Sequence, residues 1–387
     1  MKDIEITNSI KYIGASDESE KLFESQYSIP NGMAYNSYII KDEKTVILDT
    51  VDKTVTDEWI NNIERELEGK KPDYLIISHL EPDHSYNIGL LVNKYPEMKI
   101  VGNATTFRML PNFFDNINIG DKKVEVKDKD TLNIGKHTLQ FFMAPMVHWP
   151  EVMLTFEQLE GLLFSADAFG KFGKMDSSDE WVEEARRYYF GIVGKYGMQV
   201  QNILNKVSSL QIKMICPLHG PILKENLEYY INKYDVWSKY IPEKKGIFIA
   251  YASIYGNTKK VAEELFNILK EKNIENVAIC DLVKDDMAKA ISDAFSYDKM
   301  IIAASSYNAG VFPPMAHFLN AIKDRNYQNR TVGIVENGSW APSAGKSMKA
   351  IVSEMKQINL IEPIVTINST MKEANITELK NLVESMM

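Results

Sequence analysis

The sequence predicts an α/β protein of two domains, and three observations support this class. Short apolar runs of strand length alternate with helix-like stretches in the C-terminal part of the chain. In the N-terminal part, several apolar runs end close to a histidine or an acidic residue. The length of 387 residues fits two domains of ordinary size. We place their boundary in the charged, Pro- and Gly-containing segment 241–246, which gives domains of 1–243 and 244–387.

The first informative strand is the apolar run 74–78, which leads into a dense cluster of metal-binding side chains. Four strong ligands occur within the next six residues, namely His79, Glu81, Asp83 and His84. Because Pro82 favours extended geometry at Glu81, we expect the ligands to project from a loop at the strand end. Extended spacing places the first three on one side, with His84 beside them. Such a cluster can form half of a two-metal site.

The segment from His79 to His84 resembles the His-x-His-x-Asp-His motif with which the metallo-β-lactamase superfamily binds two zinc ions. Here Glu81 takes the place of the second histidine. A carboxylate makes the site harder and more anionic, which suits iron better than zinc. The glutamate-containing pattern is similar to that of the flavodiiron proteins.

This resemblance implies three further ligands, and apolar runs end at suitable residues in the order that the family uses. The runs 139–147, 162–166 and 212–218 end at His148, Asp167 and His219. The resemblance implies one iron on His79, Glu81 and His148. It implies a second iron on Asp83, His84 and His219, with Asp167 as the bridge. For any one of these residues alone, a polar loop or buried structural role is the alternative, and we assign that role to His137 and His317.

A second motif begins after residue 246. The run 247–252 predicts a buried strand, residues 253–258 form a hydroxyl-rich loop, and residues 259–270 predict a helix. Hydroxyl groups and unpaired amides at a helix start can cradle a phosphate. The loop resembles the phosphate loop of flavodoxins. It lacks the glycine spacing of dinucleotide-binding loops and the lysine of nucleoside triphosphatases, and for the loop alone an ordinary helix cap is the alternative.

Four more apolar runs, at 277–279, 300–304, 332–335 and 361–367, complete a predicted doubly wound parallel sheet of five strands. In such a sheet the ligand lies beyond the carboxyl ends of the strands. The resemblance to flavodoxins implies that Tyr307 and Trp340 border a flavin ring, and packing on the sheet surface is their alternative role. The predicted FMN-binding residues are Ser253, Ile254, Tyr255, Gly256, Asn257, Thr258, Ser305, Ser306, Tyr307, Asn308, Ala309, Gly310, Asn337, Gly338, Ser339 and Trp340.

Together the two parts resemble a two-domain flavodiiron protein along essentially the whole chain. Residues 1–243 are expected to form a metallo-β-lactamase-like αβ/βα sandwich with two iron ions. Residues 244–387 are expected to form a flavodoxin-like domain with FMN. The resemblance implies an oxidoreductase that reduces O2 to water and/or NO to N2O. It also implies a head-to-tail homodimer, or a dimer of dimers, that brings the FMN of one chain near the irons of another.

Three alternatives stay open at this point. The same architecture resembles an F420H2 oxidase, which takes hydride from a deazaflavin. The metal domain could instead be a zinc hydrolase with an appended flavodoxin module, although Glu81 argues against it. An electron-shuttling protein with a vestigial metal domain is the third. The sequence does not rank Tyr27, Tyr35, Trp149 or Glu151 as determinants of a preference between O2 and NO.

Composition limits partners and location. Hydrophobic residues make up 45% and charged residues 25%, as in ordinary globular proteins. No apolar run reaches the roughly 20 residues of a membrane span, and residues 1–6 do not resemble a signal peptide, so we expect a cytoplasmic protein. The net charge of −9 argues against nucleic-acid binding. Cys216 and Cys280 follow apolar residues and are expected to be buried thiols.

The supply of electrons is also constrained. The sequence has no Cys-x-x-Cys motif, so no rubredoxin module is fused to the chain. Electrons should therefore come from a separate carrier, which the resemblance implies to be rubredoxin or a flavoprotein reductase. An acidic carrier needs a basic landing surface, for which Lys244, Lys245, Lys259 and Lys260 are candidates.

Overall fold

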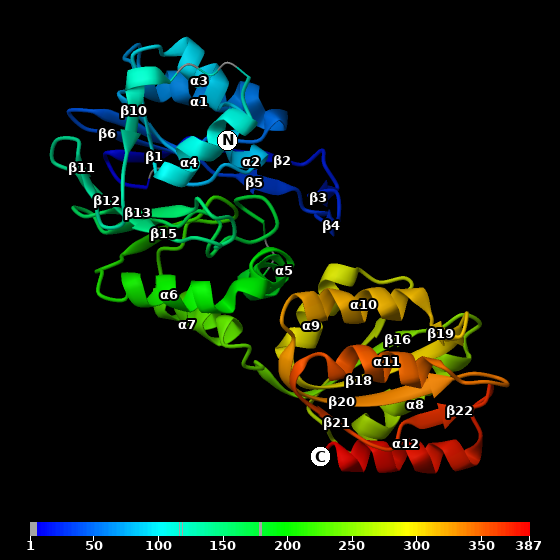
Figure 1. Ribbon diagram of the computed structural model, residues 1–387. Coiled ribbons are helices and arrows are strands. Elements are labelled where there is room, and N and C mark those ends of the chain that lie inside the picture. Colours follow the sequence, from blue (N-terminus) through cyan, green and yellow to red (C-terminus); the bar gives the residue numbers. More distant parts are fainter. Residues whose placement is uncertain (1–5, 116, 118, 178–179) are drawn as a thin grey trace. The chain divides into compact units, whose positions relative to one another are not determined.

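The computed structural model describes residues 6–115, 117, 119–177 and 180–387, and the chain divides into two compact units (Figure 1). The first unit contains Met1–Tyr189 and Met198–Asp235. The second contains Phe190–Gly197 and Val236–Met387. The chain thus passes between the units three times rather than once, because the short stretch 190–197 belongs with the C-terminal part. A functional boundary at residues 243 and 244 stays a prediction.

The first unit has a six-stranded sheet in the order β1-β6-β7-β8-β9-β10. Its strands are β1 (Ile10–Tyr12), β6 (Tyr38–Lys41), β7 (Thr45–Leu48), β8 (Tyr74–Ile76), β9 (Lys99–Gly102) and β10 (Lys123–Glu125). The pairs β1–β6 and β6–β7 are antiparallel, whereas β7 to β10 run parallel. The predicted strand at 74–78 is therefore a central strand, which explains why it is apolar throughout.

A second sheet of five strands has the order β11-β12-β13-β14-β15. Its strands are β11 (Thr131–Asn133), β12 (Thr138–Met143), β13 (Met153–Glu157), β14 (Leu162–Phe164) and β15 (Met214–Cys216). Two small hairpin-like pairs join β2 (Ala15–Asp17) to β5 (Met33–Tyr35) and β3 (Leu22–Phe23) to β4 (Tyr27–Ser28). Strands β12, β14 and β15 point the same way, so the loops that follow them meet at one edge.

The core of this unit lies between the two sheets. Ile40 and Val46 of the first sheet share one buried cluster with Phe141 and Met153 of the second. Helices lie on the outer sides, with α1 and α3 beyond the first sheet and α6 and α7 beyond the second (Figure 1). These helices, with α4 and α5, are α1 (Thr56–Leu67), α3 (Ile88–Lys94), α4 (Ala104–Met109), α5 (Trp181–Ile192), α6 (Gly197–Val207) and α7 (Leu227–Ser238). The predicted αβ/βα sandwich is confirmed.

The second unit contains a parallel sheet in the order β17-β16-β18-β20-β21. Its strands are β16 (Lys244–Ala252), β17 (Asn276–Asp281), β18 (Tyr297–Tyr307), β20 (Gln328–Asn337) and β21 (Lys356–Leu360). The predicted last strand at 361–367 is only partly right. The chain leaves the sheet after Leu360 and returns as β22 (Val365–Ile367), with Pro363 between them, because proline cannot donate a ladder hydrogen bond. The short β19 (Gly310–Val311), which pairs antiparallel with β18, was not predicted.

Helices cover both faces of this sheet, as a doubly wound fold requires. One face carries α8 (Asn257–Glu271) and α12 (Glu373–Ser385), and the other carries α9 (Met287–Ser296), α10 (Pro313–Asp324) and α11 (Ala344–Ser353) (Figure 1). Ile249 of β16 packs with Leu265 of α8 and Leu382 of α12 in one buried cluster. The predicted flavodoxin-like sheet is confirmed.

Two further expectations concern single features. Cys216 and Cys280 are buried free thiols, as expected. Throughout the part of the chain that the structure describes, every helix is too short or too polar to cross a lipid bilayer.

Candidate metal centre and flavin site

The loop after β8 delivers ligands in two directions. Glu81 is extended, with φ −57° and ψ 140°, as the following Pro82 favours. A short helix, α2 (Pro82–Ser85), begins at that proline. The expectation that Asp83 lies on the same side as His79 and Glu81 was therefore wrong, because the helical turn redirects Asp83 and His84 toward a second group. The six residues from His79 to His84 thus contribute side chains to two groups of potential metal ligands.

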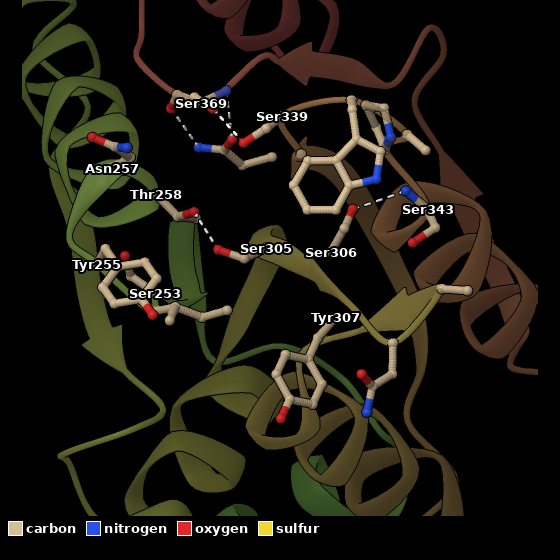
Figure 2. Close-up of a pocket in the computed structure, with 18 residues that line it drawn as sticks. Ser253, Tyr255, Asn257, Thr258, Ser305, Ser306, Tyr307, Ser339, Ser343 and Ser369 are labelled. Carbon is tan, nitrogen blue, oxygen red and sulfur yellow. Dashed lines mark hydrogen bonds between the residues drawn. The ribbon is translucent and has the colours of Figure 1, made fainter.

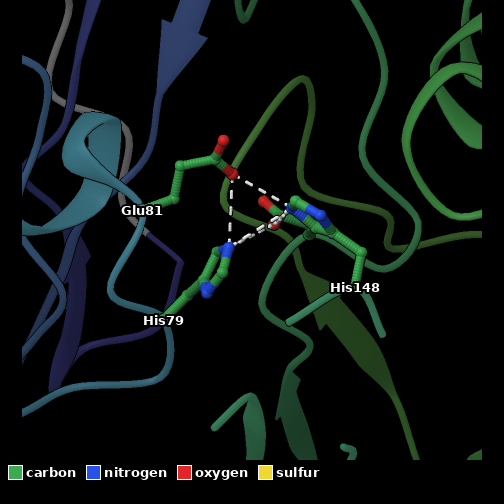
Figure 3. A group of neighbouring side chains, drawn as sticks. His79, Glu81 and His148 are labelled. Atoms are coloured by element: carbon green, nitrogen blue, oxygen red, sulfur yellow. Dashed lines mark hydrogen bonds and ion pairs between the residues drawn. The ribbon is translucent and has the colours of Figure 1, made fainter. Parts of the chain in front are cut away.

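The first group consists of His79, Glu81, His148 and Asp167. Figure 3 shows the side chains of His79, Glu81 and His148 pointing toward one another. His79 Nε2 lies 3.3 Å from Glu81 Oε2 and 3.3 Å from His148 Nε2. His148 Nε2 lies 3.0 Å from the same glutamate oxygen. Asp167 Oδ2 completes the group at 3.3 Å from His79 Nε2 and 3.2 Å from His148 Nε2.

The second group consists of Asp83, His84 and His219. Asp83 Oδ2 lies 3.3 Å from His84 Nε2 and 3.2 Å from His219 Nε2. Asp167 Oδ1 faces this group, at 3.2 Å from His84 Nε2 and 3.6 Å from His219 Nε2. Asp167 therefore presents one carboxylate oxygen to each group, which is the geometry that a bridging ligand needs. All seven residues that the sequence predicted as metal ligands are brought together.

Several of these atoms have no hydrogen-bond partner among the described residues, although they are buried. They are both carboxylate oxygens of Asp83 and of Asp167, and the Nε2 atoms of His84 and His219. Buried polar atoms without partners are costly unless a bound group satisfies them. Atoms that bind one ion at about 2.1 Å lie about 3 Å apart, which is close to the distances here. Histidine and carboxylate donors in this arrangement fit a pair of transition-metal ions.

The pKa values of several residues in the two ligand groups are shifted by burial and by the charged side chains around them. Burial opposes protonation of His148, but the nearby carboxylates of Asp167 and Glu81 outweigh it and raise the pKa of His148 to about 9. Burial raises the pKa of Asp83 to about 7, against the lowering effect of His84. Burial also opposes ionisation of Asp167, yet His148, His79 and His84 hold its pKa well below the usual range. In the absence of a metal ion, protons therefore occupy part of the site at neutral pH.

Metal uptake is accordingly expected to depend on pH. The folded protein keeps a proton on Asp83 below about pH 7 and on His148 below about pH 9, and an incoming cation must displace both. Affinity should thus rise with pH across this window, by up to about tenfold per pH unit for each displaced proton. Titration of metal-free protein with Co²⁺ at about pH 6 and about pH 8, in buffers of different ionisation enthalpy, measures both affinity and proton release. Equal affinity at the two pH values would contradict the assignment.

Residues behind the ligands hold them in place, and sequence reasoning did not identify their roles. Glu151 Oε1 accepts a hydrogen bond from His79 Nδ1 at 2.7 Å, and the backbone oxygen of Ala34 accepts one from His219 Nδ1 at 2.7 Å. The buried Asn36 donates to the backbone oxygens of Pro217 and Gly220, at 2.8 and 2.9 Å, on either side of the last ligand. A backbone oxygen such as that of Ala34 cannot be recognised in a sequence. Glu151 could have been noticed, because it is a glutamate three residues after the ligand His148.

Aromatic rings shield part of the centre. Trp149 packs edge-on against His79, with ring centroids 5.1 Å apart, and stacks on Phe113 at 6.2 Å. Tyr35 meets His219 edge-on, with ring centroids 5.8 Å apart, and Tyr27 packs on Phe172. Rings packed against buried ligands lower the local polarity, which strengthens electrostatic interactions among them.

The two remaining histidines lie apart from both groups. His137 Nδ1 bonds to the buried Glu157 at 3.0 Å, so it is a satisfied core histidine. His317 is exposed on α10. His137 therefore has the buried structural role that was predicted, whereas His317 is an exposed helix residue and not a loop or buried residue.

A cavity of about 720 Å³ opens at the carboxyl ends of the parallel strands in the second unit (Figure 2). Its size suits a mononucleotide cofactor. Fourteen of the sixteen predicted FMN-binding residues line it, and the exceptions are Gly256 and Gly310. Four lining residues were not predicted, namely Ala341, Pro342, Ser343 and Ser369. Ser369 follows β22, so the rule that places ligands after parallel strands could have found it.

One end of this cavity is shaped for a phosphate. Helix α8 begins after Gly256, whose φ of 91° suits glycine, and no side chain caps its first turn. The Ser253 hydroxyl accepts a hydrogen bond from the Gly256 amide at 3.1 Å. The hydroxyl groups of Thr258 and Ser305 lie 2.9 Å apart, within hydrogen-bonding distance (Figure 2). A helix start with free amides and nearby hydroxyls binds phosphate without a charged side chain.

The other end offers aromatic surfaces. Trp340 is 92% exposed and Tyr307 is 46% exposed, although both line the cavity. Exposed aromatic rings of this kind gain most when a flat ring system covers them. In the loop directly after Tyr307, Asn308 and Ala309 adopt positive φ angles of 47° and 57°, which give this loop a tight turn at the cavity edge. The alternative that Tyr307 and Trp340 pack on the sheet surface does not fit these exposures.

Known proteins share this architecture. A family model described as ODP family beta lactamase matches residues 33–220, and one described as Flavodoxin domain matches residues 248–362. An uncharacterized protein of Methanocaldococcus jannaschii is 30% identical over 382 residues, covering 96% of this chain and 95% of that protein. Flavo-diiron protein FprA2 of Clostridium acetobutylicum is 27% identical and covers 93% and 92%. An anaerobic nitric oxide reductase flavorubredoxin of Vibrio vulnificus is 28% identical and covers 87% and 70%.

Among solved structures, rubredoxin oxygen:oxidoreductase from Desulfovibrio gigas has the same fold, with a TM-score of 0.91 and 24% identity over 100% of this chain and 98% of that one. Fold and matches together define a class in which a lactamase-like metal domain is joined to a flavodoxin domain. The chain belongs to the flavodiiron proteins, which are oxidoreductases. Membership implies FMN and a di-iron centre as its cofactors, and the cavity and the two ligand groups fit both.

Proposed function

We propose that this protein reduces O2 to water and/or NO to N2O at two iron ions, with electrons that pass through FMN. The observation that carries the proposal is the position of Asp167, which turns one oxygen to each ligand group. A shared carboxylate keeps two metal ions close enough to act on one small molecule. The relatives named above include a nitric oxide reductase and an oxygen:oxidoreductase, and these two names support the two substrates.

The chain's own residues would hold the cofactors as follows. His79, Glu81 and His148 would bind one iron and Asp83, His84 and His219 the other, with Asp167 between them. Each position then has two imidazoles and one carboxylate of its own. This mixed nitrogen and oxygen donor set suits iron, and the carboxylate at residue 81 distinguishes it from a zinc hydrolase site.

The electron count is compatible with both reactions. Iron and FMN supply the one-electron chemistry that side chains lack. Reduction of O2 to two water molecules takes four electrons and four protons. Reduction of two NO molecules to N2O and water takes two electrons and two protons. The protein residues contribute by burying the ligands, of which His79 and Asp167 have no exposed surface, so that bulk water is kept from the reacting molecule.

The proposal includes a separate electron donor, rubredoxin or a flavoprotein reductase, because these 387 residues contain no Cys-x-x-Cys motif. It also includes a head-to-tail homodimer or dimer of dimers, in which the FMN of one chain would supply the irons of its partner. A cytoplasmic location and FMN contacts by the predicted residues belong to the same proposal. Full activity of an isolated monomer would contradict the dimer.

The decisive experiment combines metal analysis with gas consumption. Natively purified protein should contain iron and FMN, and the reduced protein should consume O2, NO or both in the steady state. Parallel assays with reduced rubredoxin and reduced F420 separate the proposal from an F420H2 oxidase. Zinc without iron, together with ester cleavage and no gas consumption, would replace the proposal by a zinc hydrolase.

A further inference from the structure

The two ligand groups differ in what lies behind their histidines. His79 Nδ1 donates to a carboxylate, that of Glu151, at 2.7 Å. His219 Nδ1 donates to a neutral backbone oxygen, that of Ala34, at the same distance. His84 Nδ1 is buried and has no hydrogen-bond partner among the described residues. Of these three histidines, only His79 therefore donates its Nδ1 hydrogen to a carboxylate in the described part of the chain.

Glu151 is held firmly in this role. Its side chain has no exposed surface, and Oε1 also accepts the Leu80 amide at 2.9 Å. Its backbone oxygen accepts a hydrogen bond from Asn103 Nδ2 at 2.6 Å. Among the described residues its other carboxylate oxygen has no partner. The negative charge of Glu151 is thus directed at His79 and is not neutralised by a lysine or arginine that the structure records.

Among the described residues, no carboxylate accepts a hydrogen bond from the Nδ1 atom of His84 or His219 in the second group. The buried Asp49 interacts electrostatically with His84, but its Oδ1 accepts a hydrogen bond from the Ser78 amide at 2.7 Å. No recorded hydrogen bond joins Asp49 to His84 in the described part of the chain. The first group has the ligand Glu81 and also Glu151, a carboxylate hydrogen-bonded to a ligand histidine. Among the described residues, the second group has the ligand Asp83 but no carboxylate hydrogen-bonded to its histidines in this way. Asp167 is common to both.

A carboxylate hydrogen-bonded to the outer nitrogen makes an imidazole more basic. A more basic and more anionic surrounding stabilises the higher charge of a metal ion. We propose that Glu151 makes the two metal positions unequal, so that in the half-reduced centre the ferric ion occupies the position of His79, Glu81 and His148. This inference rests on the iron occupancy of the proposed function. It means that the position of Asp83, His84 and His219 is the first to gain an electron and the last to lose one.

The test is a potentiometric titration of the iron-loaded protein, followed by EPR and ⁵⁷Fe Mössbauer spectroscopy. Glu151→Gln keeps a hydrogen-bond acceptor but removes the charge. We expect the equilibrium for reduction of the remaining ferric ion to shift about tenfold toward ferrous, which is about 59 mV for one electron. The Mössbauer parameters of that ferric ion should change, and those of the ferrous ion should not. Glu151→Asp, which restores the charge, should return the potential toward that of the unchanged protein.

The chain offers a matched control. Glu157 is also fully buried and also accepts a hydrogen bond from a histidine Nδ1, that of His137, at 3.0 Å. This pair lies outside both ligand groups. Glu157→Gln should therefore leave the potentials and the spectra unchanged. An effect of Glu157→Gln equal to that of Glu151→Gln would show a general loss of structure and overturn the inference.

The outcomes separate this inference from the proposed function. Wild-type potentials and spectra in fully loaded Glu151→Gln would overturn the inference, whereas the proposed function would stand. A loaded wild-type protein that consumes neither O2 nor NO would overturn the function, and the potentials would still decide the inference. If Glu151→Gln takes up little iron, Co²⁺ titration of metal-free protein decides. Weakening of one binding step by about tenfold, with the other unchanged, supports the inference, and equal weakening of both overturns it.

Discussion

Replacement of Asp167 by asparagine is expected to remove iron from both positions at once. The iron content should fall by about tenfold or more, and O2 or NO consumption by about 100-fold. The reason is geometric, since Oδ2 lies 3.2 Å from His148 Nε2 and Oδ1 lies 3.2 Å from His84 Nε2. An amide carries no charge and turns N–H donors toward one of the two groups. Iron analysis, FMN absorbance and gas consumption on one sample measure the effect.

A control must show that the loss is local. His317 is an exposed histidine on α10, so His317→Gln should leave iron, flavin and activity unchanged. FMN absorbance should also persist in Asp167→Asn, because the flavin cavity belongs to the second unit. Retention of one iron per chain in Asp167→Asn would mean that this aspartate serves a single position, and the bridging assignment would then be wrong.

The ligand residues could be predicted because each one follows an apolar strand closely. His79 comes three residues after β8, and Asp167 and His219 each come three residues after β14 and β15. The strands β14 and β15 run parallel in one sheet, so the loops that follow them lie at the same edge of that sheet. The grouping of Asp83 and His84 away from His79 depended on a helical turn at Pro82, which the expected extended geometry of the residue before proline did not include.

The supporting residues were harder to predict for a physical reason. The partner of His219 is the backbone oxygen of Ala34, 185 residues away, and a backbone oxygen carries no residue identity. Asn36 could have held any loop, because an amide side chain bonds donors and acceptors alike. Glu151 lies close to His148 in sequence but bonds His79 instead. Only the packing of the two sheets decides between such partners.

Three of the loops that line the cavity of the second unit were predicted, and a fourth lining loop, which contains Ser369, was not. Loops after β16, β18 and β20 were placed correctly because a parallel sheet exposes them at one edge. The loop that contains Ser369 was missed although the predicted run 361–367 ends at Ile367, as β22 does, because only the loops after the first, third and fourth strands were considered. Ser369 is tied to Asn337 by two hydrogen bonds, of 2.9 and 3.0 Å, so the loop that contains Ser369 supports the loop after β20.

Introduction of a negative charge into the loop before α8 should abolish FMN binding without disturbing the metal centre. Ser253→Asp places a carboxylate beside the proposed phosphate position, where the uncapped start of α8 offers only amides. Two like charges about 4 Å apart at an effective dielectric constant of about 20 repel by about 4 kcal/mol. We therefore expect the dissociation constant for FMN to rise by about 100-fold or more. Fluorescence titration of flavin-free protein measures it directly.

The matched variant is Ser253→Thr, which keeps the hydroxyl that accepts the Gly256 amide and should bind FMN within about threefold of the unchanged protein. Ser253→Asp should still load iron fully, because all seven proposed ligands lie in the first unit. Such a protein would hold a complete metal centre that, if electrons pass through FMN as proposed, the electron donor could not reduce. Unchanged FMN affinity in Ser253→Asp would place the phosphate elsewhere in the cavity, and unchanged turnover without FMN would show that electrons reach the irons by another route.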